Sequence, residues 1–132
     1  NYLKARAKKS KITATFYGFL EGESFNDVLR KCAIGIATYT SDPSNVSQYG
    51  DPGKIKRYLS LGIPVITTNV SEISREIEKS GAGVIIEYNN QKTLIDAVKK
   101  IMAGHAYYSK NAYTLSQKFY YKKIYPQMFA VV

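Results

Sequence analysis

The chain is short of the side chains from which disulfides and metal centres are built. It has one cysteine, Cys32, so an internal disulfide is excluded and a reducing compartment is indicated. The apolar residues around Cys32 predict a buried, inert thiol rather than a nucleophile. His105 is the one histidine and has no acidic partners at ligand spacing, so we expect no metal site and a surface position at a helix start.

Long apolar runs and leader sequences are lacking too. No run is long enough to cross a bilayer, and no signal peptide is found. These features favour a cytoplasmic protein or one at the cytoplasmic face of a membrane. No glycine-rich phosphate loop of the Walker or dinucleotide type occurs, which argues against a kinase or a nicotinamide enzyme. We therefore expect no cofactor.

Acidic residues are scarce, since 10 of them stand against 19 Lys and Arg, and the net charge is +9. Residues 1–44 carry seven basic and four acidic side chains, residues 45–88 five of each, and residues 89–132 seven and one. Basic ends fit an anionic partner, such as a nucleotide phosphate, an anionic lipid or nucleic acid. Because no RNA or DNA motif is present and the aromatic residues follow helical spacing, we do not expect nucleic acid to be that partner.

At 132 residues the chain has the size of one domain, and its start at Asn1 without an initiator methionine suggests a fragment of a longer protein. Strand and helix patterns alternate along it. Strands are predicted at residues 12–19, 34–39, 65–68 and 83–88, and helices at residues 3–9, 24–32, 51–61, 71–78 and from Asn90 to Gly104. Two of the helix starts are predicted by Ser24, with Asp27 three residues later, and by Ser71; Gly62 and Gly81 fit helix ends.

This alternation predicts an α/β fold, a Rossmann-like parallel sheet with flanking helices. Residues 104–132 form an aromatic and basic tail with broadly helical spacing, and we expect helices that cover the core. Plain packing is the simpler interpretation of these tyrosines, although a ligand or membrane role stays open.

The segment from Asp51 to Gly62 carries the clearest functional signal. Asp51 is a good N-cap and Pro52 suits the first helical position. The helix then opens with the free amides of Gly53 and Lys54 at the positive end of the dipole, beside the Lys54 charge, which favours a phosphate-like anion. The bland alternative is a well-made helix-to-strand crossover with a solvated lysine.

These residues resemble those of the retaining nucleotide-sugar glycosyltransferases of the two-domain GT-B fold, known as glycosyltransferase group 1. The matching pieces are Phe16-Tyr17-Gly18-Phe19, Ile34-Gly35-Ile36-Ala37, Gly81-Ala82-Gly83-Val84, and the block that contains Asp51-Pro52, Lys54-Ile55, Tyr58-Leu59, Gly62 and Pro64-Val65-Ile66. The match covers nearly the whole chain, and the block from Lys54 to Ile66 is its specific part.

The resemblance implies the C-terminal, donor-binding half of such an enzyme. The nucleotide base would lie near Gly18, Phe19 and Leu20, and the diphosphate near the helix start formed by Gly50, Asp51, Gly53 and Lys54. The family commonly has two glutamates, and this chain has Tyr49 and Arg57 at those positions. Because an arginine cannot accept a hydrogen bond from a ribose hydroxyl, Arg57 suits a phosphate or carboxylate instead.

The family's C-terminal domain begins with two more strands than we find before residue 12, so we expect a truncated single domain that is inactive by itself. The function implied is donor nucleotide-sugar binding in an enzyme that transfers a sugar to a polysaccharide or glycoconjugate. A glycan or lipid-linked acceptor would be bound by the missing N-terminal domain, with association at a membrane surface. The alternative, prompted by Arg57, is a non-catalytic binding or assembly module of the same fold.

Overall fold

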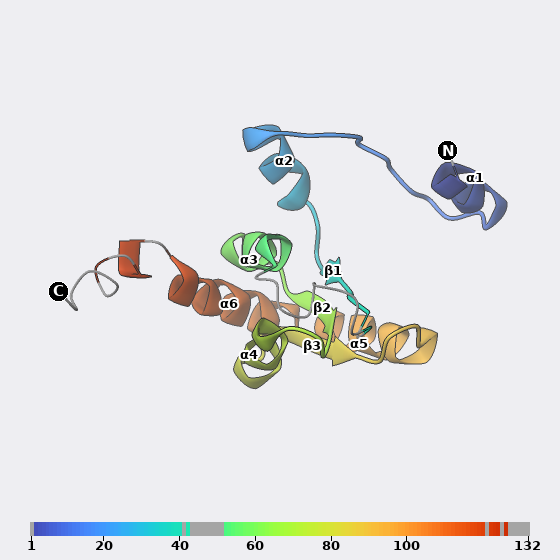
Figure 1. The fold of residues 1–132 in the computed structure, drawn as a ribbon. Coiled ribbons are helices and arrows are strands. Elements are labelled where there is room, and N and C mark those ends of the chain that lie inside the picture. The colour runs from blue at the N-terminus through green and yellow to red at the C-terminus, as the bar shows by residue number, and fades with distance from the viewer. Residues whose placement is uncertain (1, 41, 43–51, 121, 125, 127–132) are drawn as a thin grey trace.

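The computed structural model describes residues 2–40, 42, 52–120, 122–124 and 126 (Figure 1). Three short strands form one parallel sheet in the order β1-β2-β3. The elements in chain order are α1 (Tyr2–Lys9), α2 (Gly22–Leu29), β1 (Gly35–Ala37), α3 (Gly53–Ser60), β2 (Val65–Thr68), α4 (Glu72–Ser80), β3 (Gly83–Ile86), α5 (Gln91–Ala103), α6 (His105–Ser116) and the 3-10 turn η2 (Gln117–Phe119). The α/β class with flanking helices is therefore confirmed, although within the described residues the sheet has three strands rather than the four predicted.

The central strand β2 is buried on both faces. All four of its residues are buried, as expected for a parallel strand that is covered by helices on each side. Ile36 of β1 pairs with Ile66, which in turn pairs with Val84 of β3. The buried Thr67 hydroxyl adds a 2.8 Å hydrogen bond to the Ala37 carbonyl, so the end of β2 is tied to the end of β1 by a side chain as well.

Alternate residues of β2 face two separate hydrophobic clusters. Val65 belongs to the cluster that α3, α4 and α6 build on one face of the sheet, with Ile55, Leu59 and Ile77. Ile66 belongs to the other cluster, formed chiefly with residues of α5 such as Ile101. Since successive side chains of a strand point to opposite faces, one short strand anchors both layers of helices.

The helix α6 covers the core, as predicted for the tail. Its own residues Tyr108, Ala112 and Leu115 are buried against the core. The Ser109 hydroxyl, also on α6, donates a 2.7 Å hydrogen bond to the Gly62 carbonyl. Just beyond α6, Lys118 Nζ lies 2.7 Å from Glu76 Oε2 on α4, and this hydrogen bond holds the pKa of Glu76 below its ordinary value. The first part of the predicted tail is therefore a helix that packs on the α3 and α4 layer.

The predicted helices are present in the structure, with bounds that differ by a few residues. Gly62 and Gly81 both have the left-handed φ expected at helix ends, 69° and 68°. The predicted capping box at Ser24 is wrong, because α2 begins at Gly22 and Glu21 occupies the N-cap position. Ser71 does occupy the N-cap position of α4, but its side chain makes no capping hydrogen bond.

The predicted strand at residues 12–19 is wrong. The segment belongs to no sheet, and it forms part of the nearly straight stretch of chain that links α1 to α2 (Figure 1). Its apolar side chains stay exposed, with 63% of Ile12 and 54% of Tyr17 accessible. A strand requires a neighbour for its backbone hydrogen bonds, and among the described residues none lies beside this segment.

The prediction of a buried Cys32 is also wrong, because the side chain is exposed. Cys32 follows the end of α2 rather than continuing its apolar face, and its thiol lies 3.5 Å from the Val28 carbonyl oxygen. Leu29 is the one residue of α2 that is buried.

Candidate functional site

The start of α3 is the centre of the candidate site. Pro52 occupies the N-cap position with φ −75° and ψ 95°, so the helix begins one residue later than predicted. The first amides of the helix with hydrogen bonds are those of Ile55 and Lys56, both to the Pro52 carbonyl. Among the described residues the amides of Gly53 and Lys54 have no acceptor, as the anion-site hypothesis requires.

The core below α3 fixes the direction of this helix end. Ile55 and Leu59 are fully buried, whereas Lys54 is exposed. The chain leaves β1 at its carboxyl end and returns through α3 to the amino end of β2, so α3 starts on the carboxyl side of the sheet. That is the side on which open α/β sheets bind ligands.

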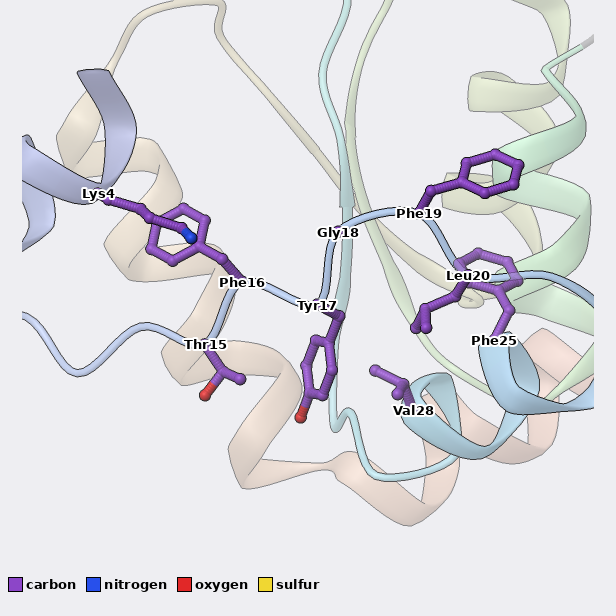
Figure 2. Close-up of a pocket in the computed structure, with 9 residues that line it drawn as sticks. All are labelled: Lys4, Thr15, Phe16, Tyr17, Gly18, Phe19, Leu20, Phe25 and Val28. Carbon is purple, nitrogen blue, oxygen red and sulfur yellow. The ribbon is translucent and has the colours of Figure 1, made fainter. Parts of the chain in front are cut away.

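The three residues predicted to surround a nucleotide base lie together in the segment before α2. Gly18, Phe19 and Leu20 line a cavity of about 710 Å³, together with aromatic and aliphatic neighbours that include Phe16, Tyr17 and Phe25 (Figure 2). Phe19 is 86% exposed, and the Lys4 ammonium lies 5.8 Å from the centre of the Phe16 ring. The cavity has large apolar and aromatic walls, which suit a planar ring.

The predicted site residues do not all meet in one cavity. Gly53 and Arg57 line a second cavity, of about 650 Å³, between α3 and α6. Neither of these two residues lines the cavity at Gly18 to Leu20, and Lys54 lines neither cavity. Tyr49, Gly50 and Asp51 lie outside the described residues.

Sequence reasoning missed a third group of residues, at the carboxyl ends of β2 and β3. Tyr39, Thr68, Glu87 and Tyr88 line a cleft of about 490 Å³ there. The Thr68 hydroxyl accepts a hydrogen bond from the Tyr39 amide at 2.9 Å and donates one to the Tyr39 carbonyl at 2.7 Å. Burial raises the pKa of the Tyr39 phenol. The sequence signal for this cleft was the pair Thr67-Thr68 at the end of an apolar strand. Threonine favours strands, but its hydroxyl can also form hydrogen bonds, as both threonines do here.

Ser71 adds an unusual hydroxyl to the same edge of the sheet. It is 5% exposed, and its Oγ has no hydrogen-bond partner in the part of the chain that the structure describes. Its carbonyl, by contrast, accepts hydrogen bonds from both the amide and the hydroxyl of Ser74. Buried polar atoms are normally paired, so the Ser71 hydroxyl is an exception within the described part of the chain.

The charged side chains of α2 and α3 influence one another. The hydrogen bonds from Asn26 and Arg30 lower the pKa of Glu23 on α2 most, and the positive charge of the exposed Arg57 makes a smaller contribution in the same direction.

Among the described residues, no three His, Cys, Asp or Glu side chains gather closely enough to hold a metal ion. The described helices include none with the length and hydrophobicity needed to span a membrane.

The parallel sheet with helices on both faces defines a Rossmann-like α/β domain. The sequence profile of the family described as "Glycosyl transferases group 1" matches residues 1–104. The chain therefore belongs to the group 1 glycosyltransferase family, and the resemblance found in its sequence is confirmed. No curated protein matches the chain, and neither does any solved structure.

Proposed function

We propose that this chain is the donor-binding domain of a glycosyltransferase, in which the start of α3 holds the diphosphate of a nucleotide sugar. The family supports glycosyl transfer in general, with a sugar donor and an acceptor. The observation that carries the proposal is the pair of unbonded amides at Gly53 and Lys54, with the exposed Lys54 side chain beside them. Oriented amides and an ammonium group stabilise the charge that develops on a leaving diphosphate.

The rest of the donor would extend from this helix end. The base would contact Gly18, Phe19 and Leu20, and Tyr49, Gly50, Asp51 and Arg57 would complete the site. The acceptor, a polysaccharide or other glycoconjugate, would be held by another domain, so we do not expect the chain to transfer sugar by itself. We place this chemistry in the cytoplasm or at the cytoplasmic face of a membrane, where a lipid-linked acceptor would be found.

Replacement of Lys54 by alanine tests this role directly. Loss of one charge-assisted contact should weaken binding of a nucleoside diphosphate about ten-fold and change binding of the matching nucleoside less than about two-fold. Isothermal titration of both ligands at fixed ionic strength measures the two affinities. Equal losses for diphosphate and nucleoside would remove Lys54 from the diphosphate site.

Arg57 supports a second candidate function, a non-catalytic binding or assembly module with the same fold. A guanidinium donates hydrogen bonds only, so it cannot accept one from a ribose hydroxyl. Under the donor-binding function, Arg57→Glu should raise nucleoside diphosphate affinity about ten-fold, because a carboxylate accepts such bonds. Isothermal titration of the variant should show little change if the chain is instead a module without donor chemistry.

A further inference from the structure

The first helix of the chain lies apart from the core. None of the residues of α1 is buried, and the helix lies away from the sheet, at the far end of the stretch that links it to α2 (Figure 1). Isolated helices shorter than about twelve residues are marginal in water, because most helical stability in proteins comes from packing. With 8 residues and none of them buried, α1 is a segment that a binding partner would stabilise.

The charge of this segment has one sign. Residues 2–20 contain no acidic side chain and five basic ones, which are Lys4, Arg6, Lys8, Lys9 and Lys11. All five are exposed, and within the described residues none of them forms an ion pair. Lys4 and Lys8 are four residues apart on one face of the helix, where like charges repel each other. An anionic surface beside α1 would offset this repulsion.

Apolar side chains lie at both ends of this basic helix. Tyr2 and Leu3 in the first turn are 73% and 61% exposed, and Ile12, directly after the helix, is exposed as well. A turn of the Schellman type ends α1, since the Ile12 amide donates a 3.1 Å hydrogen bond to the Ala7 carbonyl. Lys11 lies in that turn with φ 53°, the left-handed conformation that glycine adopts with less strain. A charged residue thus occupies a position that local stability would give to glycine.

We propose that α1 binds the surface of a membrane that contains anionic lipids. A cluster of about four or more Lys and Arg residues is typical of segments that such surfaces attract. The apolar side chains at the two ends of the helix enter the boundary between headgroups and acyl chains, while the lysine stems extend to the lipid phosphates. Nucleic acid would also attract the cations, but its phosphate backbone offers no apolar environment to Leu3 and Ile12.

This surface is distinct from the proposed donor site. Apart from Lys4, its cations line none of the cavities described above. Lys4 lines the cavity of the proposed base site, so the variants below retain it. The inference does not rest on the proposed function, because an anionic membrane binds α1 without any nucleotide.

Co-sedimentation with vesicles tests the proposal. The probes are vesicles of pure phosphatidylcholine and of phosphatidylcholine mixed with phosphatidylserine, at constant ionic strength. One variant combines Lys8→Gln, Lys9→Gln and Lys11→Gln, and its matched control combines Lys92→Gln, Lys99→Gln and Lys100→Gln, which removes three exposed lysines of α5. We expect the α1 variant to lose about ten-fold or more in affinity for the mixed vesicles, and the control less than about two-fold.

Two further variants separate membrane binding from its alternatives. Leu3→Ser with Ile12→Ser keeps the charge, and it should weaken binding to the mixed vesicles about ten-fold and binding to a single-stranded oligonucleotide less than about two-fold. Lys11→Gly removes one charge and relaxes the backbone, so it should weaken vesicle binding about five-fold without loss of helix. Circular dichroism checks the helix content of both variants.

Equal losses in the two triple-lysine variants would overturn the proposal, because they would show a response to net charge alone. It would also be overturned if the unmodified chain sedimented no better with mixed vesicles than with pure phosphatidylcholine. Tighter binding to the oligonucleotide, with no effect of Leu3→Ser and Ile12→Ser on either ligand, would identify nucleic acid as the partner instead. Since these measurements contain no nucleoside diphosphate, their failure is distinguishable from a failure of the proposed donor site.

Discussion

Gly83 stands where β3 passes close to β2, and the structure leaves no room there for a side chain. A Cβ at this position would overlap the Val65 carbonyl oxygen and lie 2.8 Å from Ile77 Cγ2. Gly83→Ala should therefore lower the free energy of unfolding by about 2 kcal/mol or more, because the backbone of the central strand would have to shift. Urea denaturation, followed by circular dichroism, measures the loss.

Gly53→Ala is the matched control for Gly83→Ala. Position 53 is exposed, has open space around it, and begins a helix. The substitution should change the free energy of unfolding by less than about 0.5 kcal/mol. Equal destabilisation of the two variants would contradict the close approach of β3 to β2.

Single residues show what sequence reasoning could and could not supply. The helix ends at Gly62 and Gly81 were predicted, because the preference of glycine for the left-handed conformation is a local property. The exposure of Cys32 was missed, since an apolar neighbourhood in sequence does not show where a helix ends in space. The unpartnered hydroxyl of Ser71 was missed for the same reason, because its environment depends on the packing of β2 and α4.

At the scale of elements, α4 and α5 begin differently although both have a good capping residue. Asn90 Oδ1 accepts hydrogen bonds from the Lys92 and Thr93 amides at 3.0 and 3.2 Å, whereas the Ser71 side chain makes no cap. Asn90→Ala should thus cost about 1 kcal/mol of stability, and Ser71→Ala less than about 0.5 kcal/mol. Thermal and urea unfolding of both variants test this difference. A Ser71→Ala loss as large as that of Asn90→Ala would mean that the Ser71 hydroxyl has a structural partner.

Elements whose stability comes from nearby contacts were predicted best. The helices α3 to α6 and the three strands were anticipated; β2 has the predicted bounds, whereas β1 and β3 are shorter than predicted. The segment 12–19 has a strong strand composition, but strand composition does not supply a neighbouring strand. The cavity at Gly18 to Leu20 shares no lining residue with the cavity at Gly53 and Arg57.

At the scale of the whole molecule, the fold and the family agree with the prediction from the sequence. Three parallel strands covered on both faces form the core, and the chain is a member of the group 1 glycosyltransferases. The cleft at the carboxyl ends of β2 and β3 was not predicted, because its walls come from residues 39, 68 and 87–88, which only the parallel register brings together. The cations on α3 extend the molecule's positive charge to the side where α/β sheets bind ligands.

A two-dimensional amide NMR titration of the 132-residue chain with uridine, guanosine and adenosine diphosphates tests the donor-binding function most directly. We predict that one of the nucleotides shifts two groups of signals together, those of Gly18 to Leu20 and those of Tyr49 to Arg57. The identity of that nucleotide would name the base of the donor. A well-dispersed spectrum in which all three nucleotides leave Gly18 to Leu20 and Lys54 unchanged would contradict the donor-binding function.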